Sequence, residues 1–330
     1  MKDILVSVCI PVYNAEKYLE IMIKSIMKQS HKNIEIIVSD NASKDNSSVI
    51  VKKLMEEDSR IKLNINNENI GFSGNVNKLI DLAKSEYIAI YHADDIYDSR
   101  IIEEQIKYLL ENNEIAGCFT LGKQIDENGQ NIRSKFYMNE KNTKCDIIVD
   151  LEKYISNIFR YGGSTFICPT SMIRKSVYEM IGVYNMKLKY VEDQDMYIRI
   201  LEKYNMGIVC KELIYYRVHP AQGSSYYSSR NRDELSSHLV QIHSYLEENI
   251  TLKNKFCNQL NKAISNDYLM LVKNNIANGN INNVKKYIEL SKKYYVYHNF
   301  KRGFLLQKSD SKIIHVIAKI LITIKIIIMK

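Results

Sequence analysis

Short apolar runs that alternate with amphipathic segments are the feature that most constrains the fold of this chain. Residues 4–13 and 33–40 are continuous apolar runs rich in β-branched residues, which is typical of strands buried on both faces of a parallel sheet. Between the two runs, apolar side chains recur at helical spacing, at Tyr18, Leu19, Met22, Ile23, Ile26 and Met27. The pattern predicts a strand, a helix and a second strand parallel to the first.

The alternation continues to about residue 91. We expect a helix after residues 41–47, a strand at 61–65, a helix at 75–84 and a strand at 87–91. Alternation of this kind predicts an α/β fold, with a Rossmann-like, mostly parallel sheet flanked by helices. A chain of 330 residues, 45% of them hydrophobic, is long enough to bury such a core.

Beyond residue 100 the pattern is less regular, and residues 131–165 show no clear period. We expect a helix at 100–113, a strand at 115–121, a strand and a helix within 169–185, a helix entered from a loop within 189–204, and a strand running into a Gly/Ser loop at 214–225. From Asn231 onward the composition turns helical and basic. We therefore predict a domain of residues 1–226, a helical basic extension of residues 227–310 and a tail of residues 311–330.

The positive charge of the chain belongs to its C-terminal part. Residues 231–330 hold 16 Lys and Arg against 7 Asp and Glu, whereas the preceding residues hold 30 against 31. The apolar tail 311–330 places most of its charges on one side of a helical wheel, and Lys325 is the exception. This favours a helix that lies on an anionic membrane surface, with packing on the protein's own core as the alternative. Dispersed lysines and an apolar end argue against nucleic acid as the partner.

Cysteine spacing and the N-terminus indicate a protein that works in the cytoplasm, at the inner face of the membrane. The six cysteines show no C-x-x-C spacing, which argues against a zinc site and a disulfide framework. Asp3 and Pro11, with no small-residue cleavage site after the first apolar run, argue against a signal peptide.

Polar residues follow each of the first four predicted strands, at residues 11–14, 39–47, 66–75 and 92–95. In parallel α/β sheets the ligand binds beyond the carboxyl ends of the strands, so these segments are expected to face one cleft. The fourth segment holds two adjacent acids, Asp94 and Asp95. Adjacent carboxylates repel each other, and they indicate either a solvated turn that caps a helix or a site for a divalent cation.

Four short motifs, in this order and spacing along the chain, resemble a known family. The segment of residues 6–47, which begins "VSVCIPVYN", together with "NIGFSGNVN", "YHADD" and "VEDQD", resembles a family 2 glycosyltransferase with the GT-A fold over about residues 4–225. The C-terminal helical extension lies outside the resemblance. The resemblance implies transfer of a sugar from a nucleotide-diphosphate sugar to a hydroxyl of a saccharide or lipid-linked acceptor. It also implies synthesis of a cell-surface polysaccharide.

The resemblance also implies where the nucleotide-sugar donor binds. The backbone at Pro11 and Val12, the ring of Tyr13 and the carboxylate of Asp40 would hold the nucleobase. An acceptor for a ring N–H suits uracil or thymine, and we expect a UDP-sugar. The remaining residues implied for the ribose, diphosphate and sugar are Gly71, Asn75, Asp94, Glu192 and Arg217.

For the chemistry, the resemblance implies a general base and a metal ion. Asp193 would take the proton from the acceptor hydroxyl in a single displacement that inverts the anomeric carbon. Asp95 would bind Mn²⁺ or Mg²⁺, and His219 is a candidate further ligand. Many members carry another acid two positions before Asp94. Here His92 stands at that position, and we assign it no metal role.

Two alternatives remain open at this point. A nucleotidyltransferase also pairs acids on a metal, but its activation loop needs a glycine-rich basic segment after the first strand, and "PVYNAEKYL" contains no glycine. A non-catalytic scaffold that binds nucleotide sugars is the other alternative. The presence of Asp94, Asp95 and Asp193 together argues against it.

Overall fold

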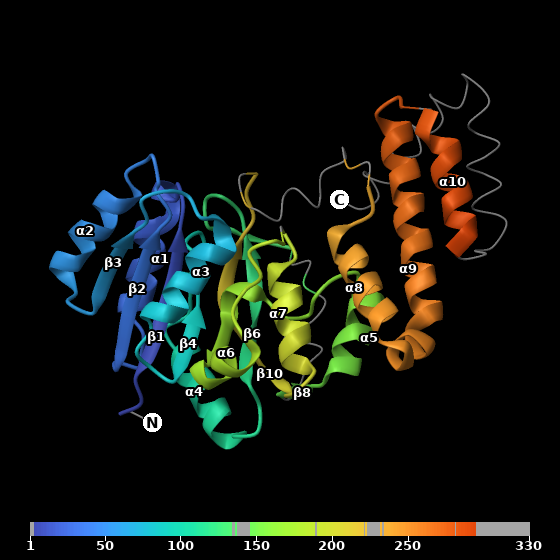
Figure 1. The fold of residues 1–330 in the computed structure, drawn as a ribbon. Helices are drawn as coiled ribbons and strands as arrows, with labels where there is room; N and C mark the ends of the chain where they lie inside the picture. Colours follow the sequence, from blue (N-terminus) through green and yellow to red (C-terminus); the bar gives the residue numbers. More distant parts are fainter. Residues whose placement is uncertain are drawn as a thin grey trace. The chain divides into compact units, whose positions relative to one another are not determined.

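The computed structural model describes residues 3–133, 136, 146–188, 190–220, 222, 232, 234–280 and 282–294. The chain divides into two compact units, residues 1–222 and 223–330 (Figure 1). The predicted membrane-associating tail, residues 311–330, lies outside the described residues.

The first four strands form one half of a single sheet, in the spatial order β3-β2-β1-β4. All three neighbouring pairs are parallel. Their bounds are β1 Val6–Val12, β2 Ile34–Asp40, β3 Ile61–Ile65 and β4 Tyr87–Ile90. The predicted α/β class and parallel half-sheet are confirmed, and the carboxyl ends of these strands lie at one edge of the sheet.

The other half of the sheet is mixed. The order continues from β4 through β9-β6-β10-β5, and β9 lies antiparallel to both β4 and β6. The strands are β5 Ile96–Tyr97, β6 Gly117–Ile125, β9 Ser171–Arg174 and β10 Met206–Arg217, with β7 Asn131–Ile132 paired to β6 and β8 Ile147–Val149 paired to β10. The pairing of β5 with β10 brings the end of β10 next to the loop that follows β4.

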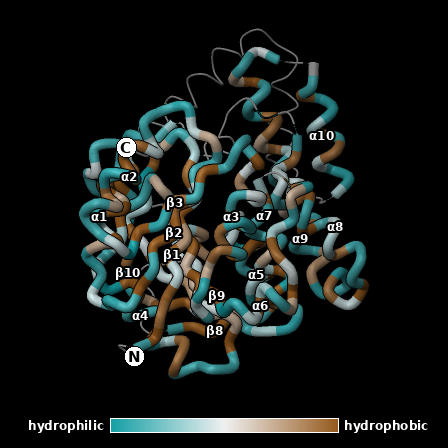
Figure 2. The backbone as a smooth tube through the Cα atoms, turned by 60° about the vertical axis from the view of Figure 1, so that its left-hand side comes forward, coloured by the Kyte–Doolittle hydropathy of each residue, from teal (hydrophilic) through white to brown (hydrophobic). Residues whose placement is uncertain are grey.

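Helices cover both faces of the sheet. In Figure 2, α1 and α2 lie on one side of the strands, α3 and α7 lie on the other, and hydrophobic stretches run through the strands between them. The helices are α1 Glu16–Met27, α2 Ser47–Glu57, α3 Gly71–Leu82, α4 Ile101–Glu111, α5 Leu151–Tyr161, α6 Lys175–Ile181 and α7 Glu192–Leu201. The residues of β1, β2 and β4 are almost all buried, which explains why these strands are largely apolar, whereas the edge strand β3 is mostly exposed or half-buried.

Several boundaries differ from the prediction, and the strand expected at 115–121 extends to Ile125 as β6. Strand β10 begins at Met206, eight residues before the predicted start at Ile214, because it pairs along its whole length with β6 through register shifts near Glu212. Helix α3 begins at Gly71 and α7 begins at Glu192, each a few residues earlier than expected. Helix α6 ends at Ile181, before Gly182, whose φ of 90° favours glycine, and this end agrees with the prediction.

The second unit is helical. It contains α8 Ser237–Glu248, α9 Ile250–Ala277 and α10 Asn282–Tyr294. Its own small core joins α9 to α10 through Leu271, Val272, Val284, Tyr287 and Ile288. Among the residues that the structure describes, no helix combines the length and apolar character needed to cross a bilayer.

Candidate active site

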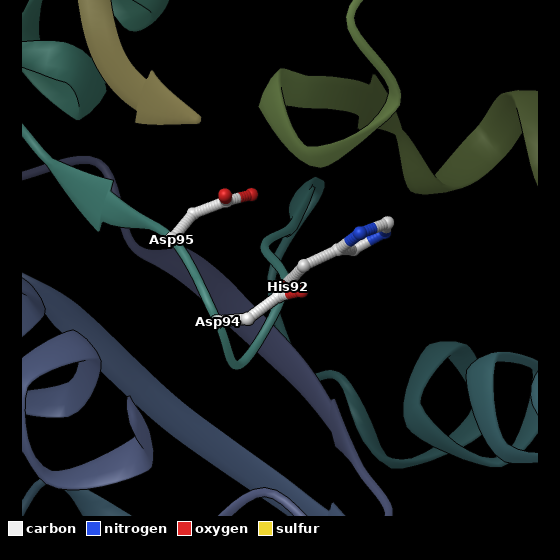
Figure 3. Close-up of side chains that lie close together, drawn as sticks. All are labelled: His92, Asp94 and Asp95. Carbon is white, nitrogen blue, oxygen red and sulfur yellow. The ribbon is translucent and has the colours of Figure 1, made fainter. Parts of the chain in front are cut away.

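The loop after β4 carries the two acids and is supported by two buried tyrosines. The backbone N–H of His92 donates to the Tyr97 hydroxyl at 2.7 Å. The Tyr97 ring stacks on Tyr91 with 4.3 Å between ring centroids, and both side chains are buried. The loop therefore rests on a rigid aromatic base. Figure 3 shows His92, Asp94 and Asp95 projecting from it, with His92 and Asp95 extending to the same side.

Asp95 is a buried carboxylate that is only half satisfied. The residue is 2% exposed. Oδ1 accepts the backbone N–H of Arg217 at 2.8 Å, whereas Oδ2 has no hydrogen-bond partner among the described residues. Burial, and then the neighbouring Asp94, raise the pKa of Asp95 well above its ordinary value. A buried acceptor left without a donor is costly, which fits a position kept for a cation.

Asp94 is paired with a histidine from the end of the sheet. Its Oδ2 lies 3.1 Å from His219 Nε2. Burial alone would raise the pKa of Asp94, but the hydrogen bond with His219 and the proximity of His92 outweigh it and leave the pKa below its ordinary value. Asp94 is thus the ionised member of the acid pair. His219 lies close enough to Asp94 for both side chains to bind the same cation.

His92 joins this cluster, which sequence reasoning did not foresee. Its ring nitrogen and one oxygen from each of Asp94 and Asp95 all lie within 4.8 Å of one another. Burial lowers the pKa of His92 even though Asp94 and Asp193 oppose that effect. A neutral imidazole is the form that binds metals. The signal in the sequence is its position two residues before Asp94, where the family pattern leads one to look for a carboxylate.

Arg217 does not have the surroundings we expected. It is 3% exposed, and its Nε donates to the Asp94 carbonyl oxygen at 2.8 Å. Its NH1 donates to the carbonyl oxygens of Asp126 and Glu127, and its guanidinium lies 4.4 Å from the Tyr18 ring centroid. A guanidinium engaged in this way is poorly placed to contact a diphosphate. We assign Arg217 to positioning the acid pair.

The expected nucleobase residues are neighbours in the sheet. Val12 lies opposite Asp40, and Pro11 opposite Ser39, in the β1–β2 register. Asp40 is 2% exposed, and its Oδ1 accepts the Ser43 N–H at 3.0 Å. The ring of Tyr13 is 49% exposed. Tyr13 is therefore a surface aromatic that can stack on a base and not a core residue.

Two residues expected at the diphosphate are engaged elsewhere. Gly71 is the first residue of α3, and its N–H donates to Asn69 Oδ1 at 2.9 Å. Asn75 is 2% exposed; its amide donates to the Ser39 carbonyl at 2.8 Å and accepts from Asn66 at 3.0 Å. The contacts of Asn75 fasten α3 to the end of β2. Asn75 is therefore a buried contact between α3 and β2, whereas Gly71 is exposed at the start of α3, and their roles in donor binding stay predictions.

The candidate base lies in the first turn of α7. Asp193 Oδ1 accepts the Gln194 N–H at 2.7 Å, and the charge of Asp193 acts on His92. Burial, reinforced by Asp193, raises the pKa of Glu192. Asp195, by contrast, pairs with Arg199, whose Nε lies 2.9 Å from Asp195 Oδ2. Asp193 and Glu192 therefore come to the same side as the His92 loop from a separate helix.

Backbone strain also gathers around the candidate site. Three non-glycine residues among those described have positive φ, Asn14 at 48°, Ala42 at 60° and Tyr190 at 72°. Asn14 follows β1, Ala42 follows β2, and Tyr190 precedes α7. Such conformations persist only where the surrounding structure enforces them, and they cluster at functional sites.

The residues present fit a divalent cation. The orphaned Oδ2 of Asp95 offers one hard ligand, and the ionised Asp94 offers a second. Imidazole nitrogens from His92 and His219 lie beside them. A set of carboxylate oxygens and imidazole nitrogens suits first-row divalent ions such as Mn²⁺.

Comparison with known proteins gives the family. Residues 7–182 match the model of "Glycosyl transferase family 2". An uncharacterized glycosyltransferase of Methanocaldococcus jannaschii is 32% identical over 263 residues, 78% of this chain and 83% of that protein. The β-1,3-glucosyltransferase WfgD of Escherichia coli, named as acting with UDP-Glc on α-D-GlcNAc-diphosphoundecaprenol, is 37% identical over 143 residues. That match spans 43% of this chain and about half, 54%, of WfgD.

A solved structure gives the same fold. Staphylococcus aureus TarS 1-349, in complex with UDP-GlcNAc, aligns with a TM-score of 0.58 at 18% sequence identity, over 89% of this chain and 93% of that one. The likeness supports the GT-A arrangement of the sheet and its helices. The family match and the sequence relatives together show that this chain is an enzyme of glycosyltransferase family 2.

Proposed function

We propose that this enzyme transfers a sugar from a UDP-sugar to a hydroxyl of a saccharide or lipid-linked acceptor, with inversion and with a divalent cation. The observation that carries the proposal is the half-satisfied Asp95, grouped with Asp94 and His92, with Asp193 of α7 close enough for its charge to act on His92. A site built in this way suits a diphosphate whose charge must be neutralised. The similarity to WfgD, whose name includes UDP-Glc and a polyprenol diphosphate, supports the choice of donor and acceptor.

The donor is held from both sides of the sheet edge. Asp40 accepts the ring N–H of uracil, the Pro11–Val12 backbone lines the base, and Tyr13 stacks on it. Asp94 lies at the ribose, and Glu192 lies at the sugar. A divalent cation, Mn²⁺ or Mg²⁺, would be held by Asp95 and His219 and would supply charge neutralisation for the diphosphate.

Asp193 is the proposed general base. Its carboxylate accepts the proton of the acceptor hydroxyl as that oxygen attacks the anomeric carbon. The bond between the anomeric carbon and the donor phosphate oxygen breaks on the opposite face, and UDP leaves with the bonding electron pair. One displacement of this kind inverts the anomeric carbon. Arg217 keeps the two acids in place through their backbone and carboxylate.

The setting we propose is cell-surface polysaccharide synthesis at the inner face of the membrane. The basic second unit would hold the enzyme near a lipid-linked acceptor on an anionic surface. Salt-dependent retention on anionic liposomes, with no retention on DNA, is the expected result. Retention on DNA or indifference to lipid charge would remove this part of the proposal.

The main test measures nucleotide release from UDP-, dTDP- and GDP-sugars with Mn²⁺, with Mg²⁺ and with EDTA. We expect metal-dependent release of UDP by the wild type and by the control variant Asp81→Asn, whose side chain is 77% exposed on α3. Release should be lost in Asp95→Ala and in Asp193→Asn. Release that is equal in EDTA, or that survives in Asp193→Asn, would refute the assigned chemistry.

A further inference from the structure

His92 is the residue of the cluster whose role the proposed function leaves open. Its ring nitrogen lies within 4.8 Å of one oxygen of Asp94 and one of Asp95. Two ligands on opposite sides of a small divalent ion, each about 2.1 Å from it, are about 4.2 Å apart. Adjacent ligands of such an ion are about 3.0 Å apart, so the three atoms can reach one ion by small movements of their side chains.

Among the described residues, the His92 ring makes only weak polar and aromatic contacts. Its contacts are Cys168, whose Sγ lies 3.9 Å from Nε2, and Phe72, whose ring meets it edge-on with 5.6 Å between centroids. A thiol is a weak hydrogen-bond partner and a phenyl ring offers none of comparable strength. These contacts orient the imidazole and leave its lone pair available.

Each of the two carboxylates has one oxygen held by a hydrogen bond. Asp95 Oδ1 is held by the Arg217 N–H at 2.8 Å, and Asp94 Oδ2 is held by His219 at 3.1 Å. Such second interactions fix ligands in direction. Within the cluster, the buried oxygen without a described partner is Asp95 Oδ2. In Figure 3 the side chains of Asp95 and His92 extend to the same side of the loop. The three candidate ligands, His92, Asp94 and Asp95, thus all come from the single loop shown in Figure 3.

We propose that His92 is a direct nitrogen ligand of the divalent cation, and that it makes the site prefer Mn²⁺ to Mg²⁺. The inference rests on the proposed function and adds a ligand to it. Mg²⁺ prefers an all-oxygen shell and keeps several waters, whereas imidazole nitrogen favours first-row transition ions. Replacing His92 by a carboxylate should make the two ions more nearly equal.

The test uses the full chain with UDP and follows Mn²⁺ by electron paramagnetic resonance, with Mg²⁺ as the competitor. We expect His92→Ala to weaken Mn²⁺ binding by about tenfold or more and to change Mg²⁺ binding much less. His92→Asp should restore affinity for both ions and lower the Mn²⁺/Mg²⁺ ratio. The control His243→Ala, on α8 of the second unit, should match the wild type.

Electron spin echo modulation from ¹⁴N then separates the two candidate histidines. If His92 is a ligand, nitrogen modulation on bound Mn²⁺ persists in His219→Ala and disappears in the double variant with His92→Asp. Modulation absent from His219→Ala, or a Mn²⁺/Mg²⁺ ratio unchanged in both His92 variants, overturns the inference while leaving the proposed function intact. Failure of the wild type to bind Mn²⁺ at all, with or without UDP, overturns both.

Discussion

Replacing Asp95 with asparagine should make the metal-free protein more stable while abolishing its activity. Asparagine is nearly isosteric with aspartate, and its Oδ1 can still accept the Arg217 N–H that Asp95 accepts at 2.8 Å. The change removes a carboxylate oxygen that is buried and has no described partner. Stability and function should therefore move in opposite directions at this one position.

The magnitude follows from the cost of that oxygen. An unsatisfied buried polar group costs about 1–3 kcal/mol, and more when it is charged. The amide nitrogen that Asp95→Asn introduces is also unpartnered, but it stays neutral at every pH, whereas Asp95 must either bind a proton or carry a buried charge, so we expect a net gain of about 1–2 kcal/mol. For a unit of this size, roughly 2–4 °C per kcal/mol gives a rise in Tm of a few degrees.

Ligand should reverse the order. With Mn²⁺ and UDP at one hundred times the Kd, the wild type gains about 2.7 kcal/mol, and the variant gains little because it has lost its metal ligand. Thermal unfolding in EDTA and then in Mn²⁺ with UDP measures both terms. Asp94→Asn is the matched control, because it weakens the contact with His219 and should not stabilise the protein in either condition. An Asp95→Asn variant less stable than the wild type in EDTA would refute the reasoning.

Three further predictions test other parts of the molecule. Asp193→Asn should lower transfer by about 10²–10⁴-fold while leaving the calorimetric affinity for UDP with Mn²⁺ within about twofold; equal loss of both would assign Asp193 to binding. Asn75→Ala should lower the free energy of unfolding by about 1–3 kcal/mol in urea because the Ser39 carbonyl loses its donor, and an unchanged midpoint would contradict that. Burial would raise the pKa of the Glu35 carboxyl, but its hydrogen bonds with Lys62, Ser7 and the Lys84 N–H outweigh burial and lower the pKa. Ionised Glu35 therefore stabilises the folded protein above the carboxyl pKa of the unfolded chain. This stabilisation is lost as the pH falls through the lowered pKa of the folded state. Glu35→Gln should therefore cost stability at pH 7 and progressively less in acid, and a cost that does not vary with pH would be inconsistent with this.

The parallel half of the sheet was predictable because most of its strand residues are buried on both faces. Residues 61–65 were predicted as a strand and form β3, and β2 starts and ends within one residue of the prediction. The strand β10 was harder to delimit, because its pairing with β6 shifts register near Glu212 and its sequence alternates less cleanly. The start of β10 is set by its long-range pairing with β6, which the local pattern of hydrophobic residues cannot predict.

The candidate site divides in a similar way. Sequence reasoning singled out Asp94 and Asp95 because two adjacent acids directly after a buried strand are unusual, and it singled out Asp193 through the family resemblance. It could not find that Arg217 is enclosed by backbone carbonyls, since those belong to a loop about ninety residues away in sequence. It also set His92 aside, because a motif defined by residue type cannot show that an imidazole comes close to two carboxylates.

The site is assembled from distant parts of the chain, and this explains which residues should matter most. The end of β10 supplies the N–H that holds Asp95, the Nε that holds the Asp94 carbonyl, and, two residues later, the imidazole that holds the Asp94 side chain. The acid pair therefore depends on β10 being docked beside β5, with which it pairs at Tyr97 and Ile96. Substitutions that loosen this strand end should disturb metal binding without touching a ligand, because both acids are held from this side.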